Sequence, residues 1–265
     1  MADETIRIGD IADAPVEGCE AIFCDFDGCL VSGGHVYPNV REFVASHADR
    51  LWIISNNSSD TAETLSNRVA SMGLAVSARR ILLAGEQAVL RIAASRPGAA
   101  VSLYAEAPIR NLARSLGLRT ETRKPDIVLL ARDPGFSLRD LGRLIDEVHD
   151  GATFVVTNID TVHPDPHGRP VPETGAVVAA VRACDPSIRF TSIGKPAPDL
   201  VELALRLSGT APEACVFIGD NDRTDGGAAK AAGVRFVHLR RMTVNGVPAT
   251  GALVMPDMAA ARGID

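Results

Sequence analysis

Two carboxylates stand one residue apart at the end of a short apolar run, in the stretch AIFCDFDGCLVSGG of residues 21–34. Because side chains alternate between the two faces of a strand, Asp25 and Asp27 point the same way and hold their charges close together. Like charges at that distance repel each other. The pair therefore needs compensation from a metal ion, a raised pKa or a cationic neighbour.

Three further polar segments follow strand-like apolar runs. They are SNNS at residues 55–58, GKP at residues 194–196 and GDNDRTD at residues 219–225. Open parallel sheets build their binding sites beyond the carboxyl ends of the strands, so four such segments in this order predict one shared site. A lone DxD or GKP usually belongs to an ordinary turn or loop, and the prediction rests on the whole set.

The residue types in this set suit a phosphate group and a hard divalent cation. Carboxylates without His or Cys partners favour Mg²⁺ over zinc, and Mg²⁺ commonly takes one or two carboxylates, waters and the phosphate of the substrate. We expect Asp25 and Asp220 to share the ion, and Lys195 to neutralise the remaining charge and to hold the phosphate. SNNS offers a hydroxyl and backbone N–H groups to phosphate oxygens, and Gly28 allows a sharp turn beside the ligand.

Several classes of function lack support in the sequence. GKP has neither the earlier glycine nor the following Ser or Thr of a P-loop, and no GxGxxG opens a helix after a strand, so sites for ATP or dinucleotides are unsupported. The formal net charge of −6 argues against non-specific binding of nucleic acid, which needs a basic surface. The apolar runs are far shorter than the ~20 residues that cross a bilayer, so we expect no membrane partner.

The amino terminus and the cysteines indicate where the protein works. The stretch MADETIRIGD is acidic and unlike a secretory signal, which predicts a cytoplasmic location. The five cysteines form an odd set without a CxxC pair, unlike a disulfide framework or a zinc site. We therefore expect reduced thiols.

The elements that must position the site alternate between strand-like and helix-like stretches. A chain of 265 residues with 46% apolar and 23% charged residues is expected to be globular and to form two domains. The alternation predicts an α/β fold with parallel strands. The predicted strands are residues 21–24, 51–55, 101–104, 127–130, 153–157, 215–219 and 234–239.

Caps and apolar periodicity predict two of the helices. One has Asp60 as its cap and Glu63 at the third position, and it ends at Gly73. The other has Ser137 as its cap and Asp140 in its first turn. Their predicted buried stripes are Ala62, Leu65, Val69 and Met72 in the first, and Leu138, Leu141, Leu144, Ile145 and Val148 in the second.

The segments DFDG, SNNS, GKPAPD and GDNDRTD occupy, in order, the four motif positions of the haloacid dehalogenase superfamily of phosphatases, which the chain resembles over nearly its whole length. The GDxxxTD form of the last motif, the following DGGAAKAAG and the stretch VTNIDTVHPDPHGRPVPETGA are similar to the NagD and p-nitrophenylphosphatase branch, which includes pyridoxal phosphatases. The resemblance implies a Rossmann-like core with a doubly wound parallel sheet and an inserted α/β cap domain. It implies a core at residues 1–83 and 187–265 and a cap at residues 84–186.

The resemblance also implies a role for the residues of the motifs. Asp25 would attack phosphorus and form an aspartyl-phosphate, and Asp27 would protonate the leaving alkoxide and then activate water. The residues expected around the phosphoryl group are Ser55, the backbone of Asn56, Asn57 and Lys195. The residues expected around Mg²⁺ are Asp25, Asp220 and the backbone carbonyl of Asp27, with Asp225 supporting them.

In the cap, the resemblance implies that the loop at residues 158–169, which begins with Asn158, faces the leaving group. Residues 163–175 hold four prolines and two glycines and predict a long loop or a hairpin. In pyridoxal phosphatases of this branch a histidine occupies the position of His163, which favours an aromatic or planar substrate. The alternative is that His163 is a turn residue before Pro164.

Together these features predict a Mg²⁺-dependent hydrolase of a small cytoplasmic phosphomonoester, with pyridoxal phosphate, a nucleoside monophosphate and a sugar phosphate as candidates. The alternative is a phosphomutase or another phosphotransferase that uses the same aspartyl-phosphate. Mutases of this superfamily carry small helical caps soon after the first motif, and the interval from Gly28 to Leu51 leaves no room for one, which favours hydrolysis. The resemblance also implies that an exposed sheet of the cap could serve as the surface of a homodimer. The chain departs from the family pattern at Cys29 and at the pair Glu173 and Thr174.

Overall fold

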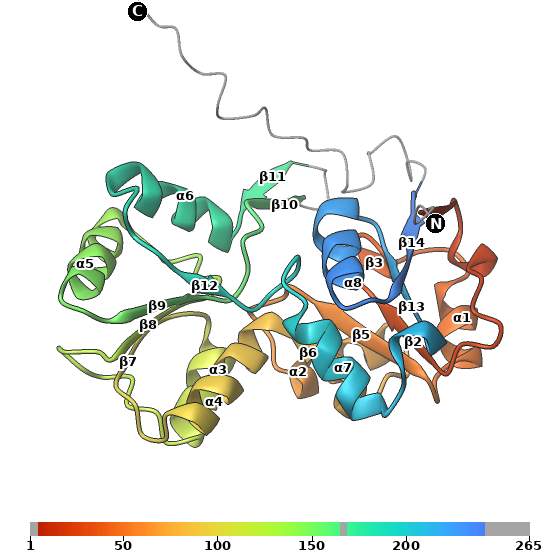
Figure 1. Ribbon diagram of the computed structural model, residues 1–265, viewed down its shortest axis with the longest axis horizontal. Coiled ribbons are helices and arrows are strands. Elements are labelled where there is room, and N and C mark those ends of the chain that lie inside the picture. The colour runs from red at the N-terminus through yellow and green to blue at the C-terminus, as the bar shows by residue number, and fades with distance from the viewer. Residues whose placement is uncertain (1–4, 165–168, 242–265) are drawn as a thin grey trace, which may run out of the picture.

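The computed structural model describes residues 5–164 and 169–241, in which helices and strands alternate along the chain (Figure 1). Residues 165–168, part of the loop expected to face the leaving group, lie outside the described residues. The larger of two main sheets has six parallel strands in the order β1-β14-β13-β2-β5-β6. Their bounds are β1 Ile6–Ile8, β2 Ala21–Cys24, β5 Leu51–Ser55, β6 Ile81–Leu83, β13 Cys215–Gly219 and β14 Arg235–Leu239.

Helices cover both faces of this first sheet, as a doubly wound fold requires. Side chains such as Ile22 and Ile53 pack on one face against α1 (Val40–Ser46) and α2 (Ala62–Ser71). Phe23 and other alternate residues pack on the opposite face. The helices on that side are α7 (Asp199–Ser208) and α8 (Gly227–Ala231). The predicted α/β class with a parallel sheet is confirmed.

The second sheet is also parallel, with four strands in the order β12-β9-β8-β7. Its strands are β7 Val101–Tyr104, β8 Ile127–Leu130, β9 Thr153–Val156 and β12 Thr191–Ser192. Helices α5 (Leu138–His149) and α6 (Thr174–Cys184) lie on one face, where Val128 and Leu130 are buried (Figure 1). The other face is covered by α3 (Ala84–Ser95) and α4 (Ala107–Ser115).

A single hydrophobic cluster connects the two sheets through α3. It contains Phe23 and Trp52 of the first sheet, Val89 and Ile92 of α3, and Leu129 of the second sheet. Burial of these side chains removes apolar surface from water on both sides of the helix at once. The two halves of the molecule therefore share an apolar core beside the polar cavity described below.

The strands at the two ends of the first sheet and at one edge of the second sheet were not predicted. β1 and β6 have three residues each and β12 has two, which is too short for a periodic signal. β12 pairs with β9 and so lies in the second sheet, although Thr191 and Ser192 fall on the core side of the expected boundary at residue 186. The division into a core at 1–83 and 187–265 and a cap at 84–186 stays a prediction.

Two hairpins and several short turns complete the described chain. Residues 163–175 were expected to form a loop or a hairpin, and their described part contains strand pairing of β10 with β11. The remaining bounds are β3 Val31–Ser32, β4 His35–Val36, β10 Val162–Pro164 and β11 Pro170–Pro172, the 3-10 turns η1 Ile11–Asp13, η2 Ala78–Arg80 and η3 Pro212–Ala214, and the π-helical turn η4 Asp222–Gly226.

The two predicted helices exist, with one correction each. The N-cap of α2 is Thr61, whose hydroxyl accepts the N–H of Thr64, and not Asp60, which instead pairs with Arg68 at 2.9 Å. The cap of α5 is Ser137 with Asp140, as predicted. Leu138, predicted to be buried, is 85% exposed because the first residue of the helix lies beyond the edge of the packed face.

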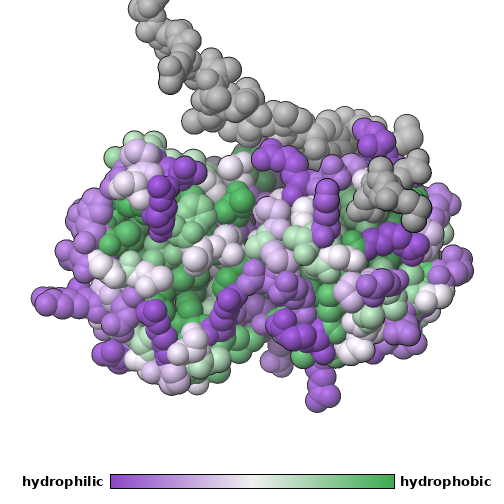
Figure 2. All heavy atoms as spheres, viewed as in Figure 1, coloured by the Kyte–Doolittle hydropathy of each residue, from purple (hydrophilic) through white to green (hydrophobic). Residues whose placement is uncertain are grey.

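The face of the molecule in Figure 2 shows hydrophobic residues at the surface of the half that holds the second sheet, and hydrophilic side chains spread over both halves. The homodimer expected through the cap stays a prediction. Within residues 5–164 and 169–241, no helix combines the length and the apolar character that a membrane crossing requires.

Candidate active site

A cavity of about 500 Å³ lies where the carboxyl ends of the strands of both sheets meet. The first sheet contributes residues that follow β2, β5 and β13, and the second sheet contributes residues that follow β7, β8 and β9. All the residues that the sequence predicted for the site line this cavity: Asp25, Asp27, Ser55, Asn56, Asn57, Asn158, His163, Lys195, Asp220 and Asp225. The structure brings them together, and their individual roles remain predictions.

Lys195 occupies the centre of the acidic side of the cavity. Its Nζ lies 2.6 Å from Asp25 Oδ1 and 2.6 Å from Asp225 Oδ1, and only 2% of the residue is exposed. The same ammonium lies 5.5 Å from the centre of the Phe217 ring. Burial alone would lower the pKa of Lys195, but the carboxylates of Asp225 and Asp25 outweigh it and raise that pKa above its ordinary value. Lys195 is therefore a fixed positive charge.

Asp25 and Asp27 both reach the cavity, as their spacing predicted. The charge of Asp25 is compensated by Lys195. Asp27 is open to the cavity but enclosed by protein on its other sides, and this enclosure, with a smaller effect of Asp25, raises the pKa of Asp27 to about 6. The turn between them and the following hairpin relies on Gly28, which has a φ of 85° and donates its N–H to Val31 O at 2.7 Å. Two of the three forms of compensation expected for this pair are thus present.

Three carboxylates are placed to hold a metal ion. Asp25, Asp220 and Asp225 each offer an oxygen, and these atoms lie within 4.8 Å of one another. Asp225 is brought this close because Gly219 has no side chain: a Cβ there would lie 2.6 Å from Asp225 Cγ. The N–H of Asn221 donates to Asp225 Oδ2 at 3.1 Å and fixes the carboxylate. An all-oxygen donor set of this kind fits a hard divalent cation.

The side chains of the SNNS segment mostly hold the loop itself in place. Ser55 Oγ accepts the N–H of Asn57 at 3.1 Å, and Asn57 Oδ1 accepts the N–H groups of Ser59 and Asp60 at 2.9 Å each. Asn56 Oδ1 accepts the N–H of Lys195 at 2.7 Å. These bonds arrange the backbone that was expected to bind the phosphoryl group and connect it to Lys195.

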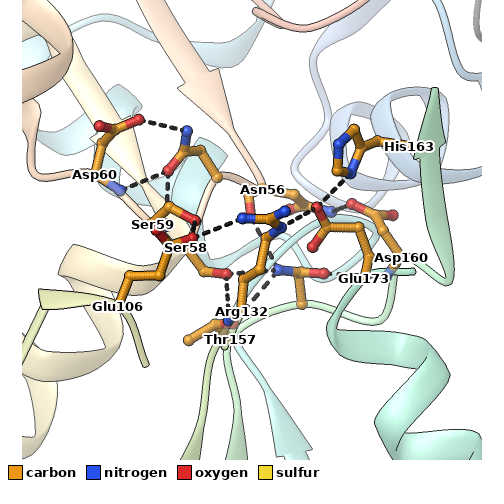
Figure 3. Close-up of polar contacts among 12 residues, drawn as sticks. Asn56, Ser58, Ser59, Asp60, Glu106, Arg132, Thr157, Asp160, His163 and Glu173 are labelled. Atoms are coloured by element: carbon orange, nitrogen blue, oxygen red, sulfur yellow. Dashed lines mark hydrogen bonds and ion pairs between the residues drawn. The ribbon is translucent and has the colours of Figure 1, made fainter. Parts of the chain in front are cut away.

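Residues of the second sheet contact the SNNS segment directly (Figure 3). Asn158, which is 1% exposed, donates from Nδ2 to Asn56 O at 2.9 Å, and Asp160 Oδ2 accepts from Asn56 Nδ2 at 2.9 Å. Asn158 therefore joins the two halves of the molecule, in addition to lining the cavity. His163 lies in β10 and not in a turn, and its Nδ1 is 2.6 Å from a carboxylate oxygen of Glu173.

Among the charged residues that line the cavity, Arg68, Glu106, Arg132 and Glu173 were not predicted as site residues. Asp160, which also lines it, belongs to the loop at residues 158–169 that was expected to face the leaving group. Glu106 and Arg132 follow the strands at 101–104 and 127–130 by two residues. The rule that polar residues after parallel strands form sites would have found both, had it been applied to the second sheet as well as the first.

The chain is similar in sequence to a known family and to several curated proteins. The family model of the haloacid dehalogenase-like hydrolases matches residues 19–233. Over 219 residues the chain is 28% identical to a dihydroxyacetone phosphatase of Corynebacterium glutamicum, covering 82% of this chain and 79% of the relative. It is 27% identical over 220 residues to the ribonucleotide monophosphatase NagD of Escherichia coli, covering 82% of this chain and 85% of the relative.

The fold is also that of a solved structure. The 4-nitrophenylphosphatase of Thermotoga maritima superposes with a TM-score of 0.79 at 23% identity, covering 87% of this chain and 89% of that one. An agreement of this extent shows a shared fold over most of both chains. The expected branch of the family is thus confirmed by relatives in sequence and its fold by a relative in structure.

Proposed function

The chain belongs to the haloacid dehalogenase-like hydrolases, and from that premise we propose that it hydrolyses a small phosphomonoester by way of a phosphoryl group carried on Asp25. The observation that supports this most is the position of Lys195 Nζ, 2.6 Å from both Asp25 Oδ1 and Asp225 Oδ1 inside the cavity. A buried cation beside a reactive carboxylate attracts the phosphoryl group and stabilises the charge that its oxygens carry in the transition state.

In the first step, a carboxylate oxygen of Asp25 attacks phosphorus. A bond forms between that oxygen and phosphorus, and the bond from phosphorus to the ester oxygen breaks. Asp27 gives its proton to the departing oxygen, so that the leaving group departs as an alcohol. The raised pKa of Asp27, about 6, leaves a protonated fraction available near neutral pH.

In the second step, Asp27, now a carboxylate, takes a proton from a water molecule as the water oxygen attacks phosphorus. The bond between phosphorus and Asp25 breaks, which releases inorganic phosphate and restores both aspartates to their starting states. The SNNS backbone and Lys195 hold the phosphoryl oxygens through both steps. The enzyme contributes mainly position and charge, as in other phosphoryl transfers.

Mg²⁺ is the cation we propose for the carboxylate set. Asp25 and Asp220 would hold it with the backbone carbonyl of Asp27, and Asp225 would orient the set through its bonds to Lys195 and Asn221. When bound, the ion supplies positive charge that offsets the repulsion between the phosphate and the carboxylates.

The second sheet and its helices are proposed to act as the cap that surrounds the leaving group. Glu106, Arg132, Asp160, His163 and Glu173 reach the cavity from this part of the chain. The relatives named for dihydroxyacetone phosphate and ribonucleotide monophosphates support a small phosphorylated metabolite as the substrate. A transferase that passes the phosphoryl group to an alcohol remains the alternative, which the release of inorganic phosphate distinguishes.

The test is the release of inorganic phosphate from p-nitrophenyl phosphate and a panel of metabolite phosphomonoesters, with Mg²⁺, by the wild type and by Asp25→Asn. We expect kcat to fall by at least about a thousandfold in Asp25→Asn with the circular dichroism spectrum unchanged. Asp146→Asn, on the exposed side of α5, is the matched control and should keep full activity. After an acid quench with radiolabelled substrate, label should remain on the wild type and not on Asp25→Asn. Turnover by Asp25→Asn at the wild-type rate would rule out the mechanism.

A further inference from the structure

The leaving-group side of the cavity contains a chain of charged side chains that starts on the SNNS loop and ends on β10 (Figure 3). Ser59 Oγ donates to Glu106 Oε1 at 2.7 Å, and Arg132 NH1 lies 2.6 Å from the same oxygen. Glu173 Oε1 lies 3.1 Å from Arg132 Nε and 2.6 Å from His163 Nδ1. One carboxylate, that of Glu173, thus engages Arg132 and His163, the two basic side chains that line this end of the cavity among the described residues of the second half.

The ion pair of Glu173 with Arg132 is partly enclosed and so is screened less by solvent than a surface pair, whereas the side chain of His163 is 40% exposed. The side chain of Glu173 is 15% exposed and that of Arg132 is 26% exposed. Charges in such surroundings interact more strongly than charges on an open surface. Glu173 therefore cancels much of the positive potential that Arg132 would otherwise present to a ligand, and the same carboxylate oxygen also lies against Nδ1 of His163.

Every lysine and arginine among the described residues of the cavity already faces a carboxylate. Lys195 lies between Asp25 and Asp225, Arg68 pairs with Asp60 at 2.9 Å, and Arg132 pairs with Glu106 and Glu173. Asp160 adds a further carboxylate on the leaving-group side. A second anionic group on the substrate would meet these carboxylates without an uncommitted arginine or lysine to bind it, and such an arrangement repels it.

The same side chains suit hydroxyl groups. A hydroxyl both donates and accepts, so it can donate to Glu106, Glu173 or Asp160 and accept from Arg132. Among the described residues that line the cavity, His163 is the one with an aromatic ring, so a flat base or pyridine ring has little to stack on. The cavity, at about 500 Å³, must also hold the phosphate and its ligands.

We infer that Glu173 is a specificity-determining residue, which makes the site select the phosphate ester of a small uncharged polyhydroxy compound and reject an ester that carries a second anionic group. This inference rests on the proposed function for the location of the phosphate. It extends that function by assigning the substrate class and the residue that enforces it. Removal of the Glu173 charge should free Arg132 Nε, which Glu173 Oε1 faces at 3.1 Å, to bind an anion beside His163.

The probes are glycerol 3-phosphate and 3-phosphoglycerate, which have the same number of carbons and differ in a CH₂OH group replaced by a carboxylate. Glu173→Gln keeps the shape of the side chain and removes its charge. The substitution spares the start of α6, because Glu173 is the N-cap residue there but makes no side-chain cap hydrogen bond. Glu121→Gln is the matched control, since the side chain of Glu121 is 89% exposed in the same half of the chain and pairs with Arg114 at 3.6 Å.

Binding is measured by calorimetry with Mg²⁺ in the Asp25→Asn background, where turnover does not contribute, and kcat/KM is measured with Asp25 intact. We expect the protein with Glu173 to prefer glycerol 3-phosphate by about tenfold or more, and Glu173→Gln to bind 3-phosphoglycerate about tenfold more tightly than before. This gain in affinity for 3-phosphoglycerate should shrink at high salt and should disappear in the double variant that combines Glu173→Gln with Arg132→Gln. Glu121→Gln should leave the preference for glycerol 3-phosphate unchanged.

An unchanged preference in Glu173→Gln, or a preference for 3-phosphoglycerate in the protein with Glu173, would overturn the inference. Hydrolysis of p-nitrophenyl phosphate, whose leaving group has neither hydroxyls nor a second anion, reports on the proposed function separately. If that hydrolysis is absent while the calorimetric preference changes as expected, the proposed reaction fails and the assignment of Glu173 stands.

Discussion

Lys195 and Asp225 form a buried ion pair, with Nζ and Oδ1 at 2.6 Å and exposed fractions of 2% and 1%. Burial raises the pKa of Asp225, and Lys195 acts in the opposite direction. Because the same ammonium also lies 2.6 Å from Asp25, its removal would leave two largely buried carboxylates without their cation. The pair therefore supports both the fold and the proposed chemistry.

Lys195→Met is expected to lower the free energy of unfolding, measured in urea without Mg²⁺, by about 3 kcal/mol or more, since it strands two buried charges. Asp225→Asn removes one of these charges. The double variant with Lys195→Met and Asp225→Asn should therefore lose less free energy of unfolding than the two single variants lose in sum. Lys230→Met, at an exposed position of α8, should change stability by about 0.5 kcal/mol or less. Additive losses in the double variant would show that the two side chains do not interact.

Removal of the metal is expected to stop the reaction. EDTA should abolish phosphate release and added Mg²⁺ should restore it. Mg²⁺ should also raise the melting temperature, because an ion that binds the folded state alone stabilises it, by about 2.7 kcal/mol at a hundred times its Kd. Asp220→Asn should lose this shift, and Asp222→Asn, an exposed acid two residues away, should keep it. Full activity in excess chelator would contradict the proposed cofactor.

Gly85→Ala is expected to disturb the SNNS loop from a position in α3. A Cβ at Gly85 would lie 2.6 Å from Ser58 Cα, and the N–H of Gly85 donates to Asn57 O at 3.1 Å. We expect a loss of roughly 1–3 kcal/mol in the free energy of unfolding and a raised KM, because the backbone that receives the phosphate must shift. Gly142→Ala is the control in α5: its Cβ meets nothing within 4 Å, and it should stabilise the protein by up to about 1 kcal/mol. Equal effects of the two substitutions would show that the contact with Ser58 is unimportant.

The acid sensitivity of stability should depend in part on Asp185. Hydrogen bonds from the Ser187 hydroxyl, from His149 and from the Ser187 N–H lower the pKa of Asp185 from 3.8 to about 2. A depressed carboxyl pKa adds stability that is fully present above the unfolded pKa and is lost as the pH falls through the folded one. The wild type should therefore be more stable than Asp185→Asn in urea at about pH 5, and this advantage should shrink towards about pH 2. Asp150→Asn is the control and should not reproduce this dependence on pH. A stability difference between the wild type and Asp185→Asn that does not change with pH would refute the prediction.

The sequence was sufficient for the parts of the site that depend on short local patterns. The i, i+2 spacing predicted that Asp25 and Asp27 share a side, and both line the cavity, although β2 ends at Cys24 and both residues lie beyond it. The alternation of strand-like runs with helix-like stretches also predicted the parallel sheets. Short apolar runs that are fully buried, such as 127–130, are typical of parallel strands.

The parts that depend on distant contacts were not predictable in this way. Asp60 has the residue type of a cap, but its carboxylate is committed to Asn57 and Arg68, and Thr61 takes the cap position instead. Thr191 and Ser192 carry too little local signal to reveal that they pair with β9. The role proposed for Glu173 depends on its contacts with Arg132 and His163, which come from other segments of the chain.

The apolar cluster that includes α3 limits which segments can be exchanged between members of the family. Val89 and Ile92 belong to one packed cluster with Trp52 of the first sheet and Leu129 of the second, so this helix belongs to neither half alone. A chimera that takes residues 84–186 from another member of the family would bring a helix whose surface matches the wrong sheet. Exchange of residues 84–186 between relatives therefore requires that residues of the other half that share this cluster, such as Trp52, change together with α3.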